Sequence, residues 1–233
     1  MAEKRAEILD IAVTLADERG LAAVSMRAIA ERVGVTPMAL YPYIGNKTAL
    51  LDAMLGHLLG QLQPPGAEAA GAGGAGGPGG AAEERGADEA GEAGTWRERL
   101  GAIARAARAV VTAHPWAAEL VFARPAVTPD SVRTVDLLYT ALLEAGVAAG
   151  EVPRLERMLS TVVIGFAASE AGGRFGAAED PRGFRGMLPD GTLPGHAQLA
   201  TALECPVDWD AEFEADIADL ALLIEAVARR GAP

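Results

Sequence analysis

The sequence has very little of several residue types, and each shortage narrows the possible folds and functions. A single cysteine, Cys205, excludes an internal disulfide framework and a zinc site built from several cysteines. Aromatic residues are limited to three Trp, three Tyr and five Phe. Alanine is by far the commonest apolar residue, which favours closely packed helices over a sheet of Val, Ile and Phe. No apolar run approaches the ~20 residues that span a bilayer. We therefore expect a cytoplasmic protein without membrane contact.

Basic residues are also scarce. The chain has 20 Lys and Arg against 32 Asp and Glu, which gives a formal net charge of −12. Lys4 and Lys47 are the only lysines, and the bias toward Arg, Ala, Gly and Pro is typical of GC-rich codons. Arginine usage is therefore no argument for nucleic-acid binding. Residues 1–60 nevertheless carry six basic and seven acidic side chains, which makes this the least acidic part of the chain.

One segment differs in composition from the rest. Residues 64–94 contain 11 Gly, 10 Ala and 3 Pro, with six acidic residues and one arginine. Such a segment cannot bury enough apolar surface to offset its ordering entropy. We interpret it as a flexible linker or loop between a first domain at 1–63 and a second at 95–233.

Helix start and stop signals divide both domains. In the first, one helix ends at Gly20, and the next three begin after Ser25, Thr36 and Asn46. In the second, the capping pattern at Thr95 predicts a helix to about His114. Further helices are predicted from Pro115 to about Arg124, from Thr128-Pro129 to Gly146, over 152–171, and from Asp208 to about Gly231. No segment alternates with period two for long enough to predict a sheet, so the expected fold is all-α.

Two short helices joined by a glycine-containing turn lie at 25–33 and 36–41. This is the pattern of a helix-turn-helix, in which the small Ala30 permits a close crossing and Val35 packs beneath the turn. An ordinary helical hairpin is the alternative interpretation. A longer sequence pattern favours the helix-turn-helix. It comprises Ser25-x-Arg27-x-Ile29-Ala30, Val33-Gly34-Val35, Leu40-Tyr41-x-Tyr43 and Asn46-Lys47-x-x-Leu50-Leu51. Over residues 5–60 it resembles the DNA-binding domain of the tetracycline-repressor (TetR) family.

The resemblance implies contacts with a pseudo-palindromic, double-stranded operator. The helix after Thr36 would enter the major groove, Arg27 would reach a base, and Lys47 would grip a phosphate. The DNA-contacting residues implied are Ser25, Arg27, Thr36, Pro37, Met38, Ala39, Tyr41, Tyr43 and Lys47. Pro42 departs from the usual recognition helix because it removes a backbone donor, so a kink or an early end is expected before Tyr43.

The second half resembles the ligand-binding domain of the tetracycline repressor's own subgroup. The matching pieces are Trp96-Arg97-Glu98, His114-Pro115-Trp116, Arg124-Pro125, Gly165-Phe166 and Phe213-Glu214. The pocket predicted on this basis comprises His114, Trp116, Leu120, Phe122, Arg124, Leu143, Met158 and Phe166. In that subgroup a histidine four positions before the Arg-Pro pair ligates magnesium. Leu120 stands there in this sequence, so we expect a hydrophobic ligand and neither a metal nor another cofactor.

Other constellations carry little chemistry. His57, His114 and His196 fall in different predicted elements, and Cys205 has no basic neighbour that would activate its thiol. Apolar faces at 162–168 and 213–227 are interpreted as a core or, as the resemblance implies, a homodimer interface. We expect a homodimeric repressor, not an enzyme, released from DNA by a small hydrophobic ligand. The alternatives are an activator or ligand-independent regulator of the same fold, and a helical enzyme or carrier that uses the second-domain cavity.

Overall fold

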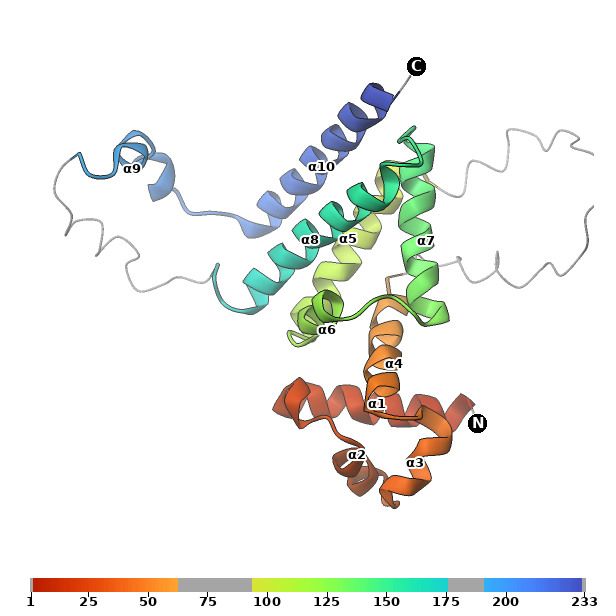
Figure 1. The fold of residues 1–233 in the computed structure, drawn as a ribbon. Coiled ribbons are helices and arrows are strands. Elements are labelled where there is room, and N and C mark those ends of the chain that lie inside the picture. Colours follow the sequence, from red (N-terminus) through yellow and green to blue (C-terminus); the bar gives the residue numbers. More distant parts are fainter. Residues whose placement is uncertain (1, 63–93, 176–190, 232–233) are drawn as a thin grey trace, which may run out of the picture.

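A computed structural model describes residues 2–62, 94–175 and 191–231, and this part of the chain contains helices and no strand. The expected all-α fold is confirmed. The first part comprises α1 (Ala2–Arg19), the short 3₁₀ helix η1 (Leu21–Ala23), α2 (Met26–Val33), α3 (Pro37–Ile44) and α4 (Lys47–Gly60). We call α1–α3 and the start of α4 the reading head; it forms the lower part of Figure 1. The proposed linker at 64–94 lies outside the described residues, except for Gly94.

The second part is a larger helical body. It comprises α5 (Trp96–Ala113), α6 (Ala117–Ala123), α7 (Pro129–Glu144), α8 (Val152–Ala171), α9 (Pro194–Gln198), η4 (Ala202–Glu204) and α10 (Trp209–Gly231). None of the helices in the described ranges is long and apolar enough to cross a membrane. The short α9 and η4 were not predicted, because each is less than two turns long and so has no helical periodicity to detect.

Side-chain caps set the helix starts where the sequence predicts them. The Ser25 hydroxyl accepts from the Ala28 amide at 3.2 Å, and the Asn46 side chain accepts from the Ala49 amide at 2.9 Å. Thr95 forms a reciprocal capping box with Glu98. Those bonds to backbone and hydroxyl donors hold the pKa of the Glu98 carboxyl below its ordinary value. Each cap satisfies backbone amides that the first helical turn leaves unpaired.

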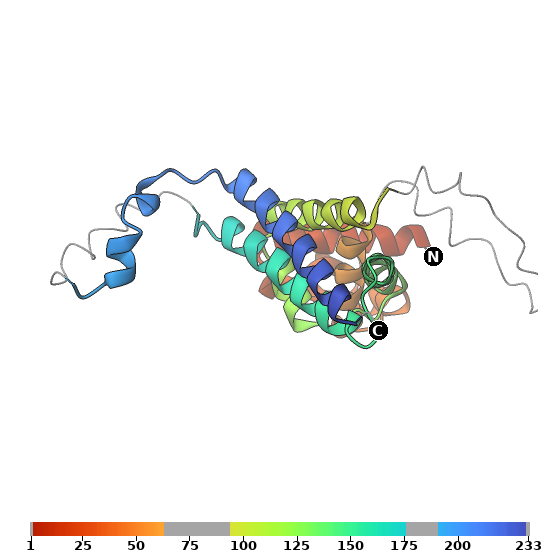
Figure 2. The ribbon, with the colours of Figure 1, turned by 90° about the horizontal axis from the view of Figure 1, so that it is seen from above.

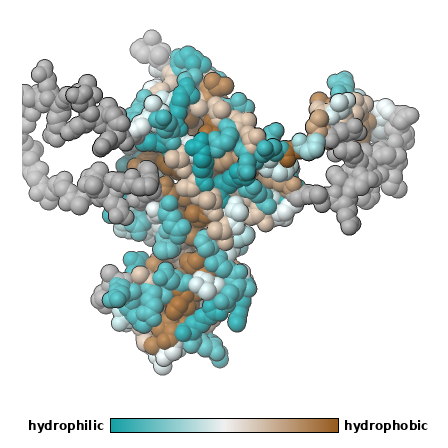
Figure 3. Space-filling view, turned by 180° about the vertical axis from the view of Figure 1, so that it is seen from behind, coloured by the Kyte–Doolittle hydropathy of each residue, from teal (hydrophilic) through white to brown (hydrophobic). Residues whose placement is uncertain are grey.

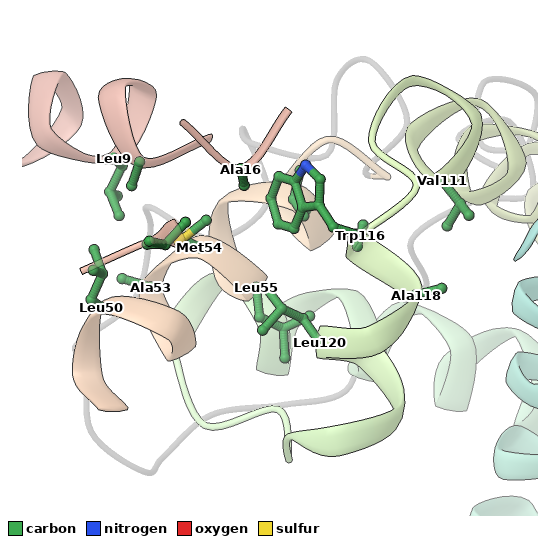
Figure 4. Close-up of a cluster of buried hydrophobic side chains, with 14 of the residues drawn as sticks. Leu9, Ala16, Leu50, Ala53, Met54, Leu55, Val111, Trp116, Ala118 and Leu120 are labelled. Carbon is green, nitrogen blue, oxygen red and sulfur yellow. The ribbon is translucent and has the colours of Figure 1, made fainter. Parts of the chain in front are cut away.

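One apolar core runs from the reading head into the body. It includes Ile8 and Ala12 of α1, Leu50 and Met54 of α4, and Leu120 of α6, all buried. Figure 4 shows α4 and α6 facing one another across this junction. A second cluster, centred on Leu142, Leu155 and Ile224, fills the far end of the body. Because the first core is shared, a shift of α6 relative to α4 changes side-chain packing in the reading head.

The last helix lies across the body. Figures 1 and 2 show α10 running over α5 and α8, with α9 standing away from the other helices. Only Phe213, Ile224 and Val227 of α10 are buried. The view from behind in Figure 3 shows hydrophobic patches on both the reading head and the body. Much of the apolar face of α10 is therefore left uncovered within one chain.

Candidate DNA-reading face and ligand cavity

The second helix of the helix-turn-helix presents an open outer face. Leu40 and Ile44 are buried and anchor α3 on the core, whereas Met38 and Tyr41 are 76% and 47% exposed. Thr36, Pro37 and Ala39 are exposed on the same side. Gly34 takes a left-handed φ of 77°, which lets the chain turn sharply between the two helices. Val35, predicted to pack beneath this turn, is instead 38% exposed, because Leu40 and Ile44 already fill the space against the core.

Pro42 does not end the recognition helix. The helix continues to Ile44, where the Gly45 amide donates to the Tyr41 carbonyl at 2.8 Å. The missing donor is tolerated because proline costs one intrahelical bond while the flanking turns remain anchored in the core. Tyr43 therefore stays on the helix, but its side chain is half-buried against the core.

Two cations flank this face. Arg27 on α2 and Lys47 at the start of α4 are both exposed, and neither has an acidic partner among the described residues. By contrast, Arg32 is bound by Glu18, and this guanidinium holds the pKa of the Glu18 carboxyl below its ordinary value. Ser25 is half-buried, and its hydroxyl caps α2. Arg27 and Lys47 are thus the cations of this face available to phosphates or base edges.

An open cavity of about 1210 Å³ lies between α4 and the helices of the body. Helices α4, α5, α7, α8 and α10 contribute its walls, and the end of α6 lies at its edge. The apolar wall includes Leu55, Leu59 and Leu62 of α4, Leu100, Ile103 and Ala104 of α5, Leu138 of α7, Leu159, Val163 and Ile164 of α8, and Leu220 and Ile224 of α10. This volume exceeds the ~300–1,000 Å³ that is typical of small-molecule sites, and a largely apolar wall favours binding by surface burial.

Several charged groups on the cavity wall already have a partner. Arg105 binds Glu214 through two bonds of 2.7 Å, and this guanidinium lowers the pKa of the Glu214 carboxyl. Arg97 is paired with Glu225 of α10. Ser160 donates to Glu156 at 2.8 Å. These polar groups surround an apolar interior, so a ligand would be oriented by few bonds and held mainly by burial.

Two of the eight predicted pocket residues lie at this cavity. Phe122 and Arg124 line it. His114, Trp116, Leu120, Leu143, Met158 and Phe166 are not among its lining residues, and their part in ligand binding stays a prediction. Leu120 is buried in the core beside Leu55, as Figure 4 shows.

The remaining predicted pocket residues have other neighbours. Leu143 is 52% exposed on the outside of α7, and Met158 packs on the second core cluster. Phe166 lies against Phe213, with ring centroids 4.9 Å apart, and Arg108 covers both rings. Helical periodicity cannot tell a face that lines a cavity from one that packs in a core.

His114 and Trp116 reach the reading head. His114 Nδ1 and Trp116 Nε1 each lie 2.7 Å from Oδ1 of Asp17, near the end of α1. A carboxylate only accepts hydrogen bonds, so both ring nitrogens donate. In Figure 4 the Trp116 ring lies between α1 and α4, close to Ala16.

A second polar link joins the cavity to α4. Arg124 Nε donates to Asp52 Oδ1 at 2.7 Å, and its Nη2 donates to the Thr48 carbonyl at 3.2 Å. Thr134 of α7 donates to the Leu59 carbonyl at 2.8 Å. Sequence reasoning missed Asp52 and the cavity-lining leucines of α4. The signal was present: Asp52 is a lone acid within an apolar helix, and such a residue normally has a partner.

The residues first considered as metal or redox sites stay apart. No three His, Cys, Asp or Glu side chains in the described ranges are placed to hold a metal ion. Cys205 is exposed, with its thiol 3.5 Å from the Thr201 carbonyl.

Comparison with known families matches both halves of the chain. Residues 8–54 match the model of bacterial regulatory proteins of the tetR family, and residues 89–228 match the tetracyclin repressor-like C-terminal domain. The chain belongs to the TetR family. It is therefore a helix-turn-helix transcriptional regulator with a DNA-binding and a ligand-binding domain, and its relatives are regulators, not enzymes.

Individual relatives agree with this assignment. A transcriptional regulator of Saccharopolyspora erythraea is 28% identical over 89% of this chain and 78% of its own length. The class A tetracycline repressor from an Escherichia coli transposon is 26% identical over 96% of this chain and 89% of its own. The fold is that of apo ActR from Streptomyces coelicolor, with a TM-score of 0.75, 23% identity and coverage of 98% of this chain and 97% of ActR.

Proposed function

We propose that this TetR-family protein is a homodimeric repressor that leaves its operator when a hydrophobic ligand fills the body cavity. The observation that carries this proposal is the shared helix α4. Its first turn holds the phosphate-gripping Lys47, and its later turns supply Leu55, Leu59 and Leu62 to the cavity wall. A ligand that presses on this wall acts on the helix that positions the reading head.

Ligand release then follows from a shift in populations. Two reading heads fit successive major grooves only when they lie about one helical turn, or ~34 Å, apart. A ligand that binds more tightly to a state with a different α4 orientation depletes the DNA-fitting state. Coupling of this kind is typically about 1–3 kcal/mol, which changes operator affinity about 5- to 150-fold.

Local charge supports DNA binding in spite of the acidic chain. Four of the seven acids in residues 1–60 are occupied: Glu7 by Lys4, Asp17 by His114 and Trp116, Glu18 by Arg32, and Asp52 by Arg124. Asp17 and Asp52 lie at the junction with the body. The reading face itself presents Arg27 and Lys47, so phosphate contacts are retained there.

The ligand class follows from the cavity. Its apolar walls and volume fit a polycyclic, largely hydrophobic molecule. Solved complexes of ActR contain actinorhodin or (S)-DNPA, and a related repressor of Streptomyces coeruleorubidus is DrrR1, 29% identical over 70% of this chain and 52% of its own length. Actinorhodin and (S)-DNPA are therefore the first compounds to test. The structure favours no second function class over this one.

The test is operator binding by fluorescence anisotropy on DNA from upstream of the protein's own gene, with and without candidate compounds. A cavity-filling variant, Ala104→Phe, should keep operator affinity but lose the response to the active compound. Ala102 is exposed on the same helix and does not line the cavity, so Ala102→Phe should respond like the wild type. Absence of specific DNA binding, or an unchanged response in Ala104→Phe, would contradict the proposal.

A further inference from the structure

The corner between α5 and α6 directs two side chains at one carboxylate of the reading head. Pro115 disfavours helical geometry at His114, so α5 ends there with a φ of −131° and a ψ of 75°. The chain resumes in α6 after Trp116. As a result the two rings lie on the same side of the corner, with centroids 5.7 Å apart, and both reach Asp17.

This contact links the reading head to the body. Both bonds are 2.7 Å long and end on the same oxygen, Asp17 Oδ1. Charge-assisted bonds of this kind are stronger and more directional than neutral ones. Trp116 is buried in the shared core, so it cannot follow α1 without moving α6. The carboxylate therefore fixes α1 to the start of α6.

Helix α6 is held to the reading head at both ends. Its start is bonded to α1 through Asp17, and the residue that ends it, Arg124, is bonded to Asp52 of α4. Between these two points lie Val121 and Phe122, which line the cavity. A displacement of seven-residue α6 by a bound molecule is thus transmitted to two helices of the reading head at once.

We propose that Asp17 is a positioning residue that makes α1 follow α6, so that filling the cavity reorients the whole reading head and not α4 alone. This inference rests on the proposed function, because it assigns the route by which the cavity and the operator are coupled. Asp17 contacts neither site: it acts through His114 and Trp116.

The experiment compares four variants of the full chain. Asp17→Ala removes the acceptor, and Trp116→Phe removes one donor while keeping an aromatic ring in the core. Asp17→Asn retains an oxygen acceptor without the charge. Asp10→Ala is the matched control, because Asp10 is an exposed acid on the same helix whose side chain has no bond in the described structure.

The first measurement is the coupling ratio, defined as the dissociation constant for the aromatic dye anilinonaphthalene sulfonate with upstream operator DNA divided by that without it. We expect this ratio to be about five-fold smaller in Asp17→Ala and Trp116→Phe than in the wild type, and so nearer to one. Dye affinity in the absence of DNA should stay within about two-fold of the wild-type value. Asp17→Asn should retain part of the wild-type coupling, and Asp10→Ala should retain all of it. A purely structural role would lower the melting temperature and leave the ratio unchanged.

The second measurement needs neither DNA nor dye. Amide exchange in the last turn of α1, residues 16–19, should be about ten-fold faster in Asp17→Ala than in Asp10→Ala, because the local opening of α1 is no longer restrained. Equal exchange in the two variants overturns the inference, as does an unchanged coupling ratio. If the wild type binds no operator DNA, the proposed function fails, and the exchange result still decides whether Asp17 holds α1.

Discussion

Some charged residues of the reading head form ion pairs or hydrogen bonds with other side chains, and others are free to contact DNA. Arg27 and Lys47 belong to the second group, but they stand in different places. Arg27 projects from the first helix of the helix-turn-helix, whereas Lys47 occupies the first turn of α4, where side-chain charge and helix dipole act together on an anion. They should therefore contribute differently to binding.

Replacing Lys47 by Ala should weaken binding to every DNA sequence by a similar factor. It should also reduce the slope of log affinity against log salt by about one, because one phosphate contact is lost. Arg27→Ala should instead relax the preference at one base pair, worth about 1–3 kcal/mol of discrimination. Anisotropy titrations on the operator and on single-base variants at several salt concentrations separate the two. A uniform loss in both variants would show that Arg27 contacts only a phosphate.

Arg108 holds three helices together at the other end of the molecule. Its Nε lies 2.7 Å from Oε2 of Glu170 on α8, and its Nη2 lies 2.7 Å from Oδ1 of Asp210 on α10. The guanidinium lowers the pKa of the Glu170 carboxyl. A carboxyl whose pKa is lower in the folded state stabilises the fold above its unfolded pKa, and this contribution is lost as the pH falls through the folded value.

Glu170→Gln should consequently lower the free energy of unfolding by about 1–2 kcal/mol at neutral pH. The difference from the wild type should shrink below about pH 4, where the wild-type carboxyl also becomes protonated. Urea unfolding at pH 7 and at lower pH measures both quantities. Asp210 bonds the same guanidinium but its side chain is 87% exposed, so Asp210→Asn should have little effect. A difference that stays constant with pH would contradict this account of Glu170.

At the scale of elements, α4 is packed unusually closely against the start of α7. A Cβ added to Gly56 would lie 2.2 Å from Thr128 Oγ1, an atom that caps α7. Gly60, one turn further along α4, would place its Cβ 3.8 Å from the nearest atom, Asp130 Cβ. Gly56 is thus required by the close approach of reading head and body, whereas Gly60 is not.

Gly56→Ala should destabilise the protein by about 1–3 kcal/mol, because overpacking outweighs the gain in helix propensity. It should also change operator affinity, since the added methyl group alters the angle between α4 and α7. Gly60→Ala is the matched control, and it should leave stability unchanged or raise it by up to about 1 kcal/mol. Thermal unfolding and operator titration of both variants check this. Equal effects at the two positions would mean that α4 and α7 are not constrained at Gly56.

The elements were predictable because their boundary signals are local. Ser25, Asn46, Thr95 and Thr128 each cap the helix that follows, and the capping bond involves residues only three apart in sequence. Each helix start could therefore be placed from a few neighbouring residues. The continuation of α3 through Pro42 was not predictable in the same way, because core contacts of Leu40 and Ile44 decide it.

The cavity could be predicted only in part because its walls come from helices distant in the sequence. Phe122 and Arg124 line it, whereas Trp116 and Phe166 lie in a junction and an aromatic cluster. Phe122 and Phe166 stand on helices, and Trp116 and Arg124 cap the two ends of α6. Which faces meet to enclose a space depends on packing between helices, which local periodicity does not encode.

At the scale of the whole molecule, α8 and α10 present faces that one chain does not cover. Val162 is 40% exposed, and nothing lies within 4 Å of a Cβ added at Gly165, so a neighbouring helix could approach closely there. On α10, Leu222 is 58% exposed. It continues a stripe of small exposed residues at Ala211, Ala215 and Ala218. Two such helices from each of two copies would form the dimer that a two-fold operator requires.

Leu222→Glu should therefore disrupt the proposed dimer, because it buries a charge without a partner in that face. Sedimentation equilibrium should show a monomer at concentrations where the wild type is a dimer. Operator affinity should fall more than about ten-fold, since a single reading head loses the second half-site. Leu143 is similarly exposed but lies on α7, so Leu143→Glu tests whether a surface glutamate alone has this effect. If Leu222→Glu remains a dimer with a wild-type melting temperature, the two copies associate through another surface.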